Sequence, residues 1–159
     1  MGCISDTDPQ PLLIRSCLGM YAIAFVGMIN NAEQLVDTCF SGHGHQFMAM
    51  SNGKVNQAEL VAALISQKDS LVEGIRHAQQ LIDGSATILL LLPDGILAAR
   101  DRVGRLPVLV GKNATAVACP LSPLPTTSWA MPITMSWAPE RLSVLRRRAW
   151  SSCPLPGRR

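Results

Sequence analysis

Apolar residues form short runs along the first 112 residues of the chain, separated by turn signals and by helical stripes. The run at 21–26 is typical of a buried strand. Three further runs, at 87–92, 96–99 and 107–110, predict additional strands. The tight turn Pro93-Asp94-Gly95 separates the first two of these, so they are predicted to form a hairpin.

Three helix starts share one signal, a capping residue followed three positions later by glutamate. They are Asn30 with Glu33, Asn56 with Glu59, and Ser70 with Glu73. The first helix is predicted to end near Gly42 and the third at Gly84, because glycine commonly follows a helix. A strand, helices and then antiparallel strands predict an α+β fold in which helices cover a sheet.

The composition changes abruptly after Lys112. Residues 1–112 carry eight Lys/Arg and ten Asp/Glu, whereas residues 113–159 carry six Arg and a single acid, Glu140. The second segment also holds seven of the eleven prolines and all three tryptophans. These differences predict one domain at 1–112, followed by a basic tail at 113–159 that is irregular and unstructured.

The cysteines and the apolar runs limit the compartment. Five cysteines without regular spacing favour reduced thiols and a cytoplasmic protein over a secreted disulfide framework. Cys17 and Cys39 lie in apolar surroundings and are predicted to be small core residues. The start of the chain is polar and acidic, unlike a signal peptide, and the longest apolar run, 88–92, is too short to cross a membrane.

The most distinctive motif follows the predicted hairpin. Arg100 and Asp101 form a basic–acidic pair, Gly104 permits a bend, and Pro107 opens the next strand, where its missing N–H costs little. This pattern closely resembles the glutaminase domain of class II glutamine amidotransferases. Upstream, residues 27–35 (Gly-Met-Ile-Asn-Asn-Ala-Glu-Gln-Leu) resemble the Gly-Asn-Leu-x-Asn-Ala-x-x-Leu helix entry of that family, with Asn31 in the place of its second asparagine.

The resemblance covers about residues 1–112. Residues 51–65 fall where the family has a Ser-Asp-Thr-Glu turn and a helix, and residues 1–11 fall where it has a Gly-His-x-Arg-Tyr-Ser-Thr strand. It implies a fragment of a layered αββα Ntn-hydrolase domain. Within the superfamily the pattern is most similar to the amidophosphoribosyltransferases, and asparagine synthetases, which share Arg-Asp-Arg-x-Gly, are the alternative.

The resemblance also implies an activity. Amidophosphoribosyltransferases release ammonia from glutamine and transfer it to phosphoribosyl pyrophosphate, giving phosphoribosylamine, the first step of purine synthesis. They are homo-oligomers, and their Mg²⁺ belongs to a phosphoribosyltransferase domain that this chain is expected to lack. We therefore expect no cofactor and no metal in this chain, and glutamine as the family substrate.

Two departures from the family pattern predict that the chain alone is inactive. The family nucleophile is an N-terminal cysteine whose own α-amine acts as base, and it lies upstream of the segment that matches here. Cys3 aligns with a later strand, and we interpret it as structural. Val26 stands where the family has its oxyanion-hole asparagine, and Asn52-Gly53-Lys54 replaces an acidic turn. The backbone N–H of Gly27 keeps its position and can serve an oxyanion.

Other residues have simpler interpretations. His43 and His45 could bind a metal, but no cluster of cysteines or carboxylates accompanies them, so an exposed loop is the better interpretation. Arg146-Arg147-Arg148 beside Trp150 could bind phosphates and stack on a base. The alternative function is therefore a non-catalytic binding module with a nucleic-acid-binding tail, whereas the glutaminase interpretation predicts neither a nucleic-acid nor a membrane partner.

The tail has a further explanation at the level of the gene. When synonymous codons are chosen for 113–159 and the frame is shifted by one base, the translation contains Ser-Phe-Glu-Ser and Gly-Pro-Gly-Glu-Ile-Val, features of amidophosphoribosyltransferases after this point. This result favours these enzymes over asparagine synthetases. It also implies that the tail was never selected as protein.

Sequencing the genomic DNA around the Lys112 codon tests this explanation. We expect a single-base change there to restore a reading frame that continues into a phosphoribosyltransferase domain. If no such change restores that frame, the tail is a genuine end of the protein.

Overall fold

The computed structural model describes residues 10–43, 50–51, 53–101, 108–112, 117–118, 133–136, 142–146 and 150–153. Its centre is an antiparallel sheet of six strands in the order β1-β2-β5-β6-β10-β11. These strands are β1 (Leu12–Ser16), β2 (Gly19–Ile29), β5 (Gly84–Leu92), β6 (Gly95–Ala99), β10 (Leu142–Arg146) and β11 (Trp150–Cys153).

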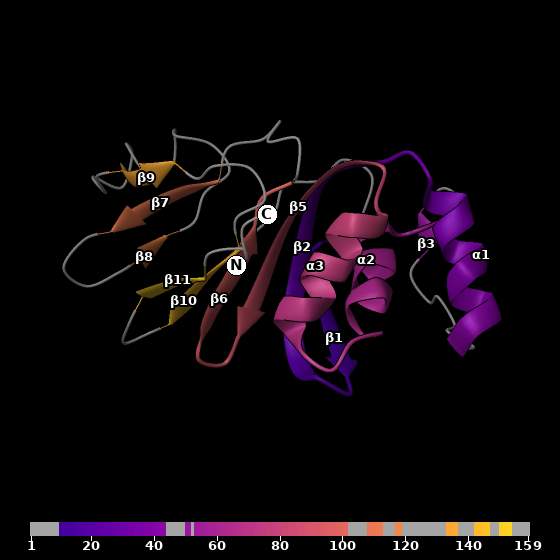
Figure 1. Ribbon diagram of the computed structural model, residues 1–159, viewed down its shortest axis with the longest axis horizontal. Helices are drawn as coiled ribbons and strands as arrows, with labels where there is room; N and C mark the ends of the chain where they lie inside the picture. Colours follow the sequence, from indigo (N-terminus) through magenta and orange to yellow (C-terminus); the bar gives the residue numbers. More distant parts are fainter. Residues whose placement is uncertain are drawn as a thin grey trace, which may run out of the picture.

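Two helices lie on one face of this sheet, and a third lies beside them (Figure 1). They are α1 (Ala32–His43), α2 (Gln57–Ile65) and α3 (Leu71–Leu81). Helices α2 and α3 lie in front of β2 and β5, and α1 lies beyond α2 (Figure 1). Two smaller sheets pair β3 (Met50–Ser51) with β4 (Lys54–Val55), and β7 (Leu109–Lys112) with both β8 (Val117–Ala118) and β9 (Ile133–Ser136). The predicted α+β class is confirmed. Within the described ranges, none of the helices has the length and apolar character needed to span a bilayer.

Strand β2 and helix α2 form most of the core. Tyr21, Ile23 and Phe25 alternate along β2 and are buried, as are all residues of 60–65 in α2. Gly74 lets α3 approach α2 closely, because a methyl group there would overlap the carbonyl oxygen of Ile65. Helix α2 is therefore enclosed on several sides, which explains why its sequence is apolar all round rather than along one stripe.

Two of the three predicted caps are confirmed. The side-chain oxygen of Asn56 accepts hydrogen bonds from the backbone N–H groups of Ala58 (2.8 Å) and Glu59 (3.3 Å) at the start of α2. At the start of α3, the Ser70 hydroxyl oxygen accepts from the N–H of Glu73 (3.2 Å) and the hydroxyl donates to its carboxylate (3.2 Å). Both helices thus begin where short-range signals place them.

The predicted hairpin is also confirmed. Strands β5 and β6 pair from Ile88 with Ala99 to Leu92 with Gly95, so Pro93 and Asp94 form the two-residue turn. Strand β1 was not predicted. It pairs with β2 through a turn at Cys17 and Leu18, which Ser16 precedes and Gly19, with a φ of +107°, follows.

Several predicted boundaries are wrong. Helix α1 begins at Ala32 after Asn31, so Asn30 is not its capping residue. Helix α3 ends at Leu81, and Gly84 does not follow it directly but opens β5. The strand predicted at 107–110 was also expected in the main sheet. It appears as β7, which belongs to a separate sheet because β10 occupies the edge of β6.

Parts of the tail, which the sequence predicts to be unstructured, are described as short strands. Strand β10 pairs with β6 from Leu142 with Ala99 to Arg146 with Gly95, and β11 pairs with β10. The stretch 142–146 is free of proline, and the open edge of β6 offers backbone groups for pairing. The tail prolines lie outside these strands, as their lack of an N–H requires. Trp129 and Trp137 lie outside the described residues.

Gln67, in the segment between α2 and α3, links side chains of α1 and α3. The Gln67 Nε2 donates to the Cys39 Sγ (3.5 Å), and its Oε1 lies 3.1 Å from the His77 Nε2. Burial, and then the nearby Lys68 ammonium, lower the pKa of His77 below its ordinary value of 6.5.

We predict that acid destabilises the fold through His77. A lowered pKa means that the unfolded chain binds the proton more readily, so the free energy of unfolding should fall as the pH drops below about 6.5. Urea unfolding measured at several pH values between about 8 and about 5 should show this decrease. His77→Gln should remove much of it, whereas His45→Gln, which keeps His77, should retain it. Equal slopes in the two variants would contradict the prediction.

Candidate functional site where β2 meets β5

Two glycines lie where the end of β2 pairs with the start of β5, at positions where a side chain would overlap the partner strand. A methyl group at Gly27 would overlap the carbonyl oxygen of Ser85, and one at Gly84 would overlap the carbonyl oxygen of Met28. Gly84 also has a φ of +135°, which other residues rarely adopt. Both positions therefore require glycine, whatever chemistry takes place beside them.

Hydrogen bonds hold the two chain segments together just beyond this contact. The Asn31 Nδ2 donates to the carbonyl oxygen of Leu81 (2.9 Å), and its Oδ1 accepts from the N–H of Asp83 (3.0 Å). The N–H of Asn30 donates to the carbonyl oxygen of Asp83 (2.8 Å). Asn31 thus joins the start of α1 to the loop between α3 and β5. This geometry gives Asn31 a structural task.

The alternation of β2 fixes the direction of the backbone at Gly27. The N–H of Phe25 donates to the Gln10 Oε1 (2.7 Å), on the β1 side, and the N–H of Met28 donates to the Ser85 Oγ (3.2 Å), on the β5 side. Since neighbouring residues of a strand point to opposite sides, the N–H of Gly27 is directed to the β1 side. Strand β1 begins opposite Ile23, so it does not extend alongside Gly27.

Val26 lies directly opposite Thr87. Thr87 is only 1% exposed, and its hydroxyl has no hydrogen-bond partner among the residues that the structure describes. The Val26 side chain cannot supply one, because it has neither a donor nor an acceptor. The family pattern has an asparagine at position 26. Valine therefore replaces a polar side chain directly opposite the buried hydroxyl of Thr87.

The Arg100–Asp101 motif reaches the same end of the sheet. Ile88 pairs with Ala99, so Arg100 follows at the level of Thr87. The carbonyl oxygen of Arg100 accepts a hydrogen bond from the Gln79 Nε2 of α3 (2.7 Å), and Asp101 is only 2% exposed. Of the predicted site residues, Gly27, Asn31, Arg100 and Asp101 are thus in the described structure. Gly104 and Pro107 lie outside the described residues.

Of the five cysteines, the structure describes the side chains of two, one exposed and one buried. Cys39 is buried, as predicted, and burial raises its pKa, which keeps the thiol protonated. The prediction that Cys17 is a core residue is wrong: it lies in the β1–β2 turn and is exposed, and its thiol donates to the carbonyl oxygen of Ser66 (3.8 Å), just after α2.

The remaining candidates add no metal or nucleophile to this site. Cys3, His45 and Asn52 lie outside the described residues. Gly53 and Lys54 form a turn and the start of β4. Across the part of the chain that the structure describes, His, Cys, Asp and Glu side chains form no group of three that could hold a metal ion.

Comparison with known proteins identifies relatives of this arrangement. A family model described as a glutamine amidotransferase domain matches residues 3–124. The chain is 27% identical over 108 residues to the amidophosphoribosyltransferase of Methanocaldococcus jannaschii, a match that covers 68% of this chain and 22% of that enzyme. It is 25% identical over 105 residues to the Archaeoglobus fulgidus enzyme of the same name, with 66% and 22% covered.

Two solved structures share the fold. One is the glutamine phosphoribosylpyrophosphate amidotransferase from B. subtilis complexed with ADP and GMP, with a TM-score of 0.79 and 22% identity. The other is described as the allosteric regulatory enzyme of purine biosynthesis, with a TM-score of 0.80 and 22% identity. Each match covers 91% of this chain and 31% or 30% of the solved chain. The chain thus has the fold of the Ntn-hydrolase glutaminase domain of these enzymes, and spans about a fifth of the curated relatives.

We predict that Asn31→Ala weakens the fold. It removes both side-chain hydrogen bonds that join α1 to the α3–β5 loop, at a cost of about 1–2 kcal/mol in the free energy of unfolding. Asn30→Ala is the matched control, because Asn30 contributes its backbone N–H and should change little. Urea unfolding followed by circular dichroism measures both variants. Equal decreases in the free energy of unfolding of the two variants would contradict a structural role for the Asn31 side chain.

Proposed function

Because the chain belongs to the glutamine amidotransferase domain family, we propose that it carries part of a glutaminase site of an amidophosphoribosyltransferase-like protein. Glutamine is the substrate that this site would take. The single observation that supports this placement is Gly27, whose N–H is directed away from β5 at the closest contact of the two strands.

The chemistry of amide hydrolysis explains what this site can contribute. Attack on the glutamine carboxamide places a negative charge on its oxygen, and hydrogen-bond donors fixed around that oxygen stabilise it. The backbone N–H of Gly27 would be one such donor. The second donor of the family is an asparagine side chain, and Val26 occupies its position in the pattern.

The loss of one donor has a large effect on rate. Removing a single oxyanion donor typically slows an enzyme by a factor of about 10² to 10³. We therefore propose that this chain does not hydrolyse glutamine at a measurable rate, while the backbone that would cradle the carboxamide is intact. The expected loss of rate follows from the replacement of the asparagine donor by Val26, whatever the nucleophile.

The complete reaction of the relatives is a further step of the proposal. Transfer of ammonia to phosphoribosyl pyrophosphate, the Mg²⁺ that accompanies it and homo-oligomeric assembly belong to proteins of which this chain spans about a fifth. The free thiols at Cys17 and Cys39 accord with the cytoplasmic location predicted from the sequence.

We predict that glutamine hydrolysis by the purified chain equals that of a buffer blank, and that Val26→Asn strengthens glutamine binding. One added hydrogen bond of about 1 kcal/mol corresponds to about a fivefold gain in affinity. Amide signals of Gly27 and Met28 in a glutamine titration measure binding, and coupled detection of ammonia measures hydrolysis. Val26→Ala is the matched control and should bring no gain.

Two results would contradict this proposal. Ammonia release that disappears in Cys3→Ala would identify Cys3 as the nucleophile and overturn its structural interpretation. If neither the original chain nor Val26→Asn responds to glutamine in the titration, β2 and β5 do not form a glutamine site.

A further inference from the structure

Strand β1 forms an open edge of the six-stranded sheet. In the described structure it is the first strand of the sheet and pairs with β2 alone. Natural proteins protect such edges with lysines, prolines or bulges. Strand β1 has none of these within Leu12–Ser16: its register with β2 is regular, and Arg15 is its single charge.

The pairing with β2 shows which backbone groups of this edge are available. Phe25 directs its N–H toward the β1 side, and alternation gives Ile23 and Tyr21 the same direction. Their partners Leu12 and Ile14 therefore exchange hydrogen bonds with β2. The N–H and carbonyl groups of Leu13 and Arg15 point the other way, to the outside of the sheet.

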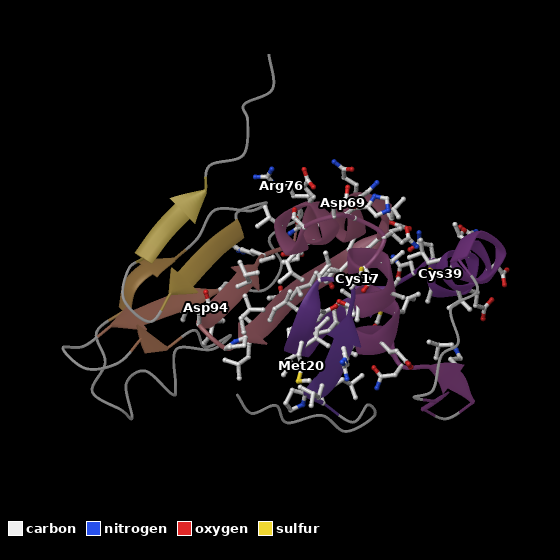
Figure 2. All side chains as sticks on the ribbon, turned by 90° about the horizontal axis from the view of Figure 1, so that it is seen from below. Cys17, Met20, Cys39, Asp69, Arg76 and Asp94 are labelled. Atoms are coloured by element: carbon white, nitrogen blue, oxygen red, sulfur yellow. The ribbon has the colours of Figure 1, made fainter. Side chains whose placement is uncertain are left out.

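Exposed apolar side chains gather at the same place. Leu13 is 72% exposed and Met20, opposite Arg15 on β2, is 52% exposed. Both lie on the sheet face opposite the helices, because Leu12 and Ile14 alternate with Leu13 on the face of the buried Tyr21 and Ile23. Figure 2 shows Met20 at the margin of the hairpin, away from α2 and α3.

We propose that β1 binds β1 of a second copy of this chain, in an antiparallel pair centred on Ile14. This register places Leu13 of each copy opposite Arg15 of the other. Each copy then donates two N–H groups and accepts at two carbonyl groups, which satisfies all the outward backbone groups of Leu13 and Arg15. The aliphatic stem of Arg15 packs between Met20 of its own chain and Leu13 of the second copy.

The sequence of β1 excludes the neighbouring registers. Centring the pair on Leu13 places Arg15 opposite Pro11, which has no N–H to donate. Centring it on Arg15 places two arginines directly opposite each other, and like charges in that position are destabilising. The second copy is thus favoured as the occupant because Leu13, Ile14 and Arg15 are complementary to themselves.

Sedimentation velocity of the full chain over a wide concentration range tests this pairing. We expect the average mass to rise from 17.1 kDa toward twice that value with concentration. Leu13→Lys should weaken association by at least about tenfold, because it places a lysine opposite Arg15 of the second copy. Met28→Lys is the matched control, since Met28 is 64% exposed on the same face of β2 but lies away from the edge.

The register itself is tested by a compensating change. In Leu13→Lys combined with Arg15→Glu, each new lysine faces a new glutamate across the pair, so association should return. A chain that stays monomeric at every concentration overturns the proposal. Equal weakening by Met28→Lys shows association through the sheet face instead, and failure of the double variant to recover shows that β1 does not pair about Ile14.

Discussion

The close contact between β2 and β5 is the constraint on which the rest of the described structure depends. Gly27 and Gly84 permit it, each by lacking a side chain where the other strand places a carbonyl oxygen. Just beyond it, Asn31 binds the backbone of Leu81 and Asp83 and so fixes how α1 leaves the sheet and how α3 returns to it. The direction of the Gly27 N–H and the position of Val26 opposite Thr87 follow from the alternation and register of β2 in the same part of the sheet.

This constraint changes what Gly27 can tell about function. Glycine is needed there for steric reasons, so its presence is expected in any chain with this fold, active or not. The residue that distinguishes an active from an inactive chain is the one before it, at position 26. A side chain at position 26 does not affect the strand contact, and valine fits a strand well. The fold can thus persist with a residue at position 26 that offers no hydrogen bond, and among the described residues the buried hydroxyl of Thr87 has no partner.

Features set by nearby residues could be predicted from the sequence, whereas those set by distant contacts could not. The caps at Asn56 and Ser70 and the Pro93–Asp94 turn depend on groups within a few positions, and all three were predicted. Strand β1 was missed because Leu12, Leu13 and Ile14 are consecutive apolar residues and show no alternation. Cys17 was misplaced because apolar neighbours in the sequence do not show that a residue lies in a turn. Asn31 matched the family pattern, but its partners lie 50 and 52 residues away, which no local pattern reveals.

Strand formation in the tail likewise depends on a contact that is distant in the sequence. Pairing of β10 with β6 does not require that residues 142–146 were selected for this place, because a sheet edge pairs with any proline-free stretch whose alternation suits it. Leu142 and Val144 alternate with Ser143 and Leu145 closely enough to serve. The presence of strands in the tail therefore does not separate a genuine end from a frame-shifted one. It does show that the composition break after Lys112 marks a change in sequence character, while the sheet that begins in the first segment continues into the second.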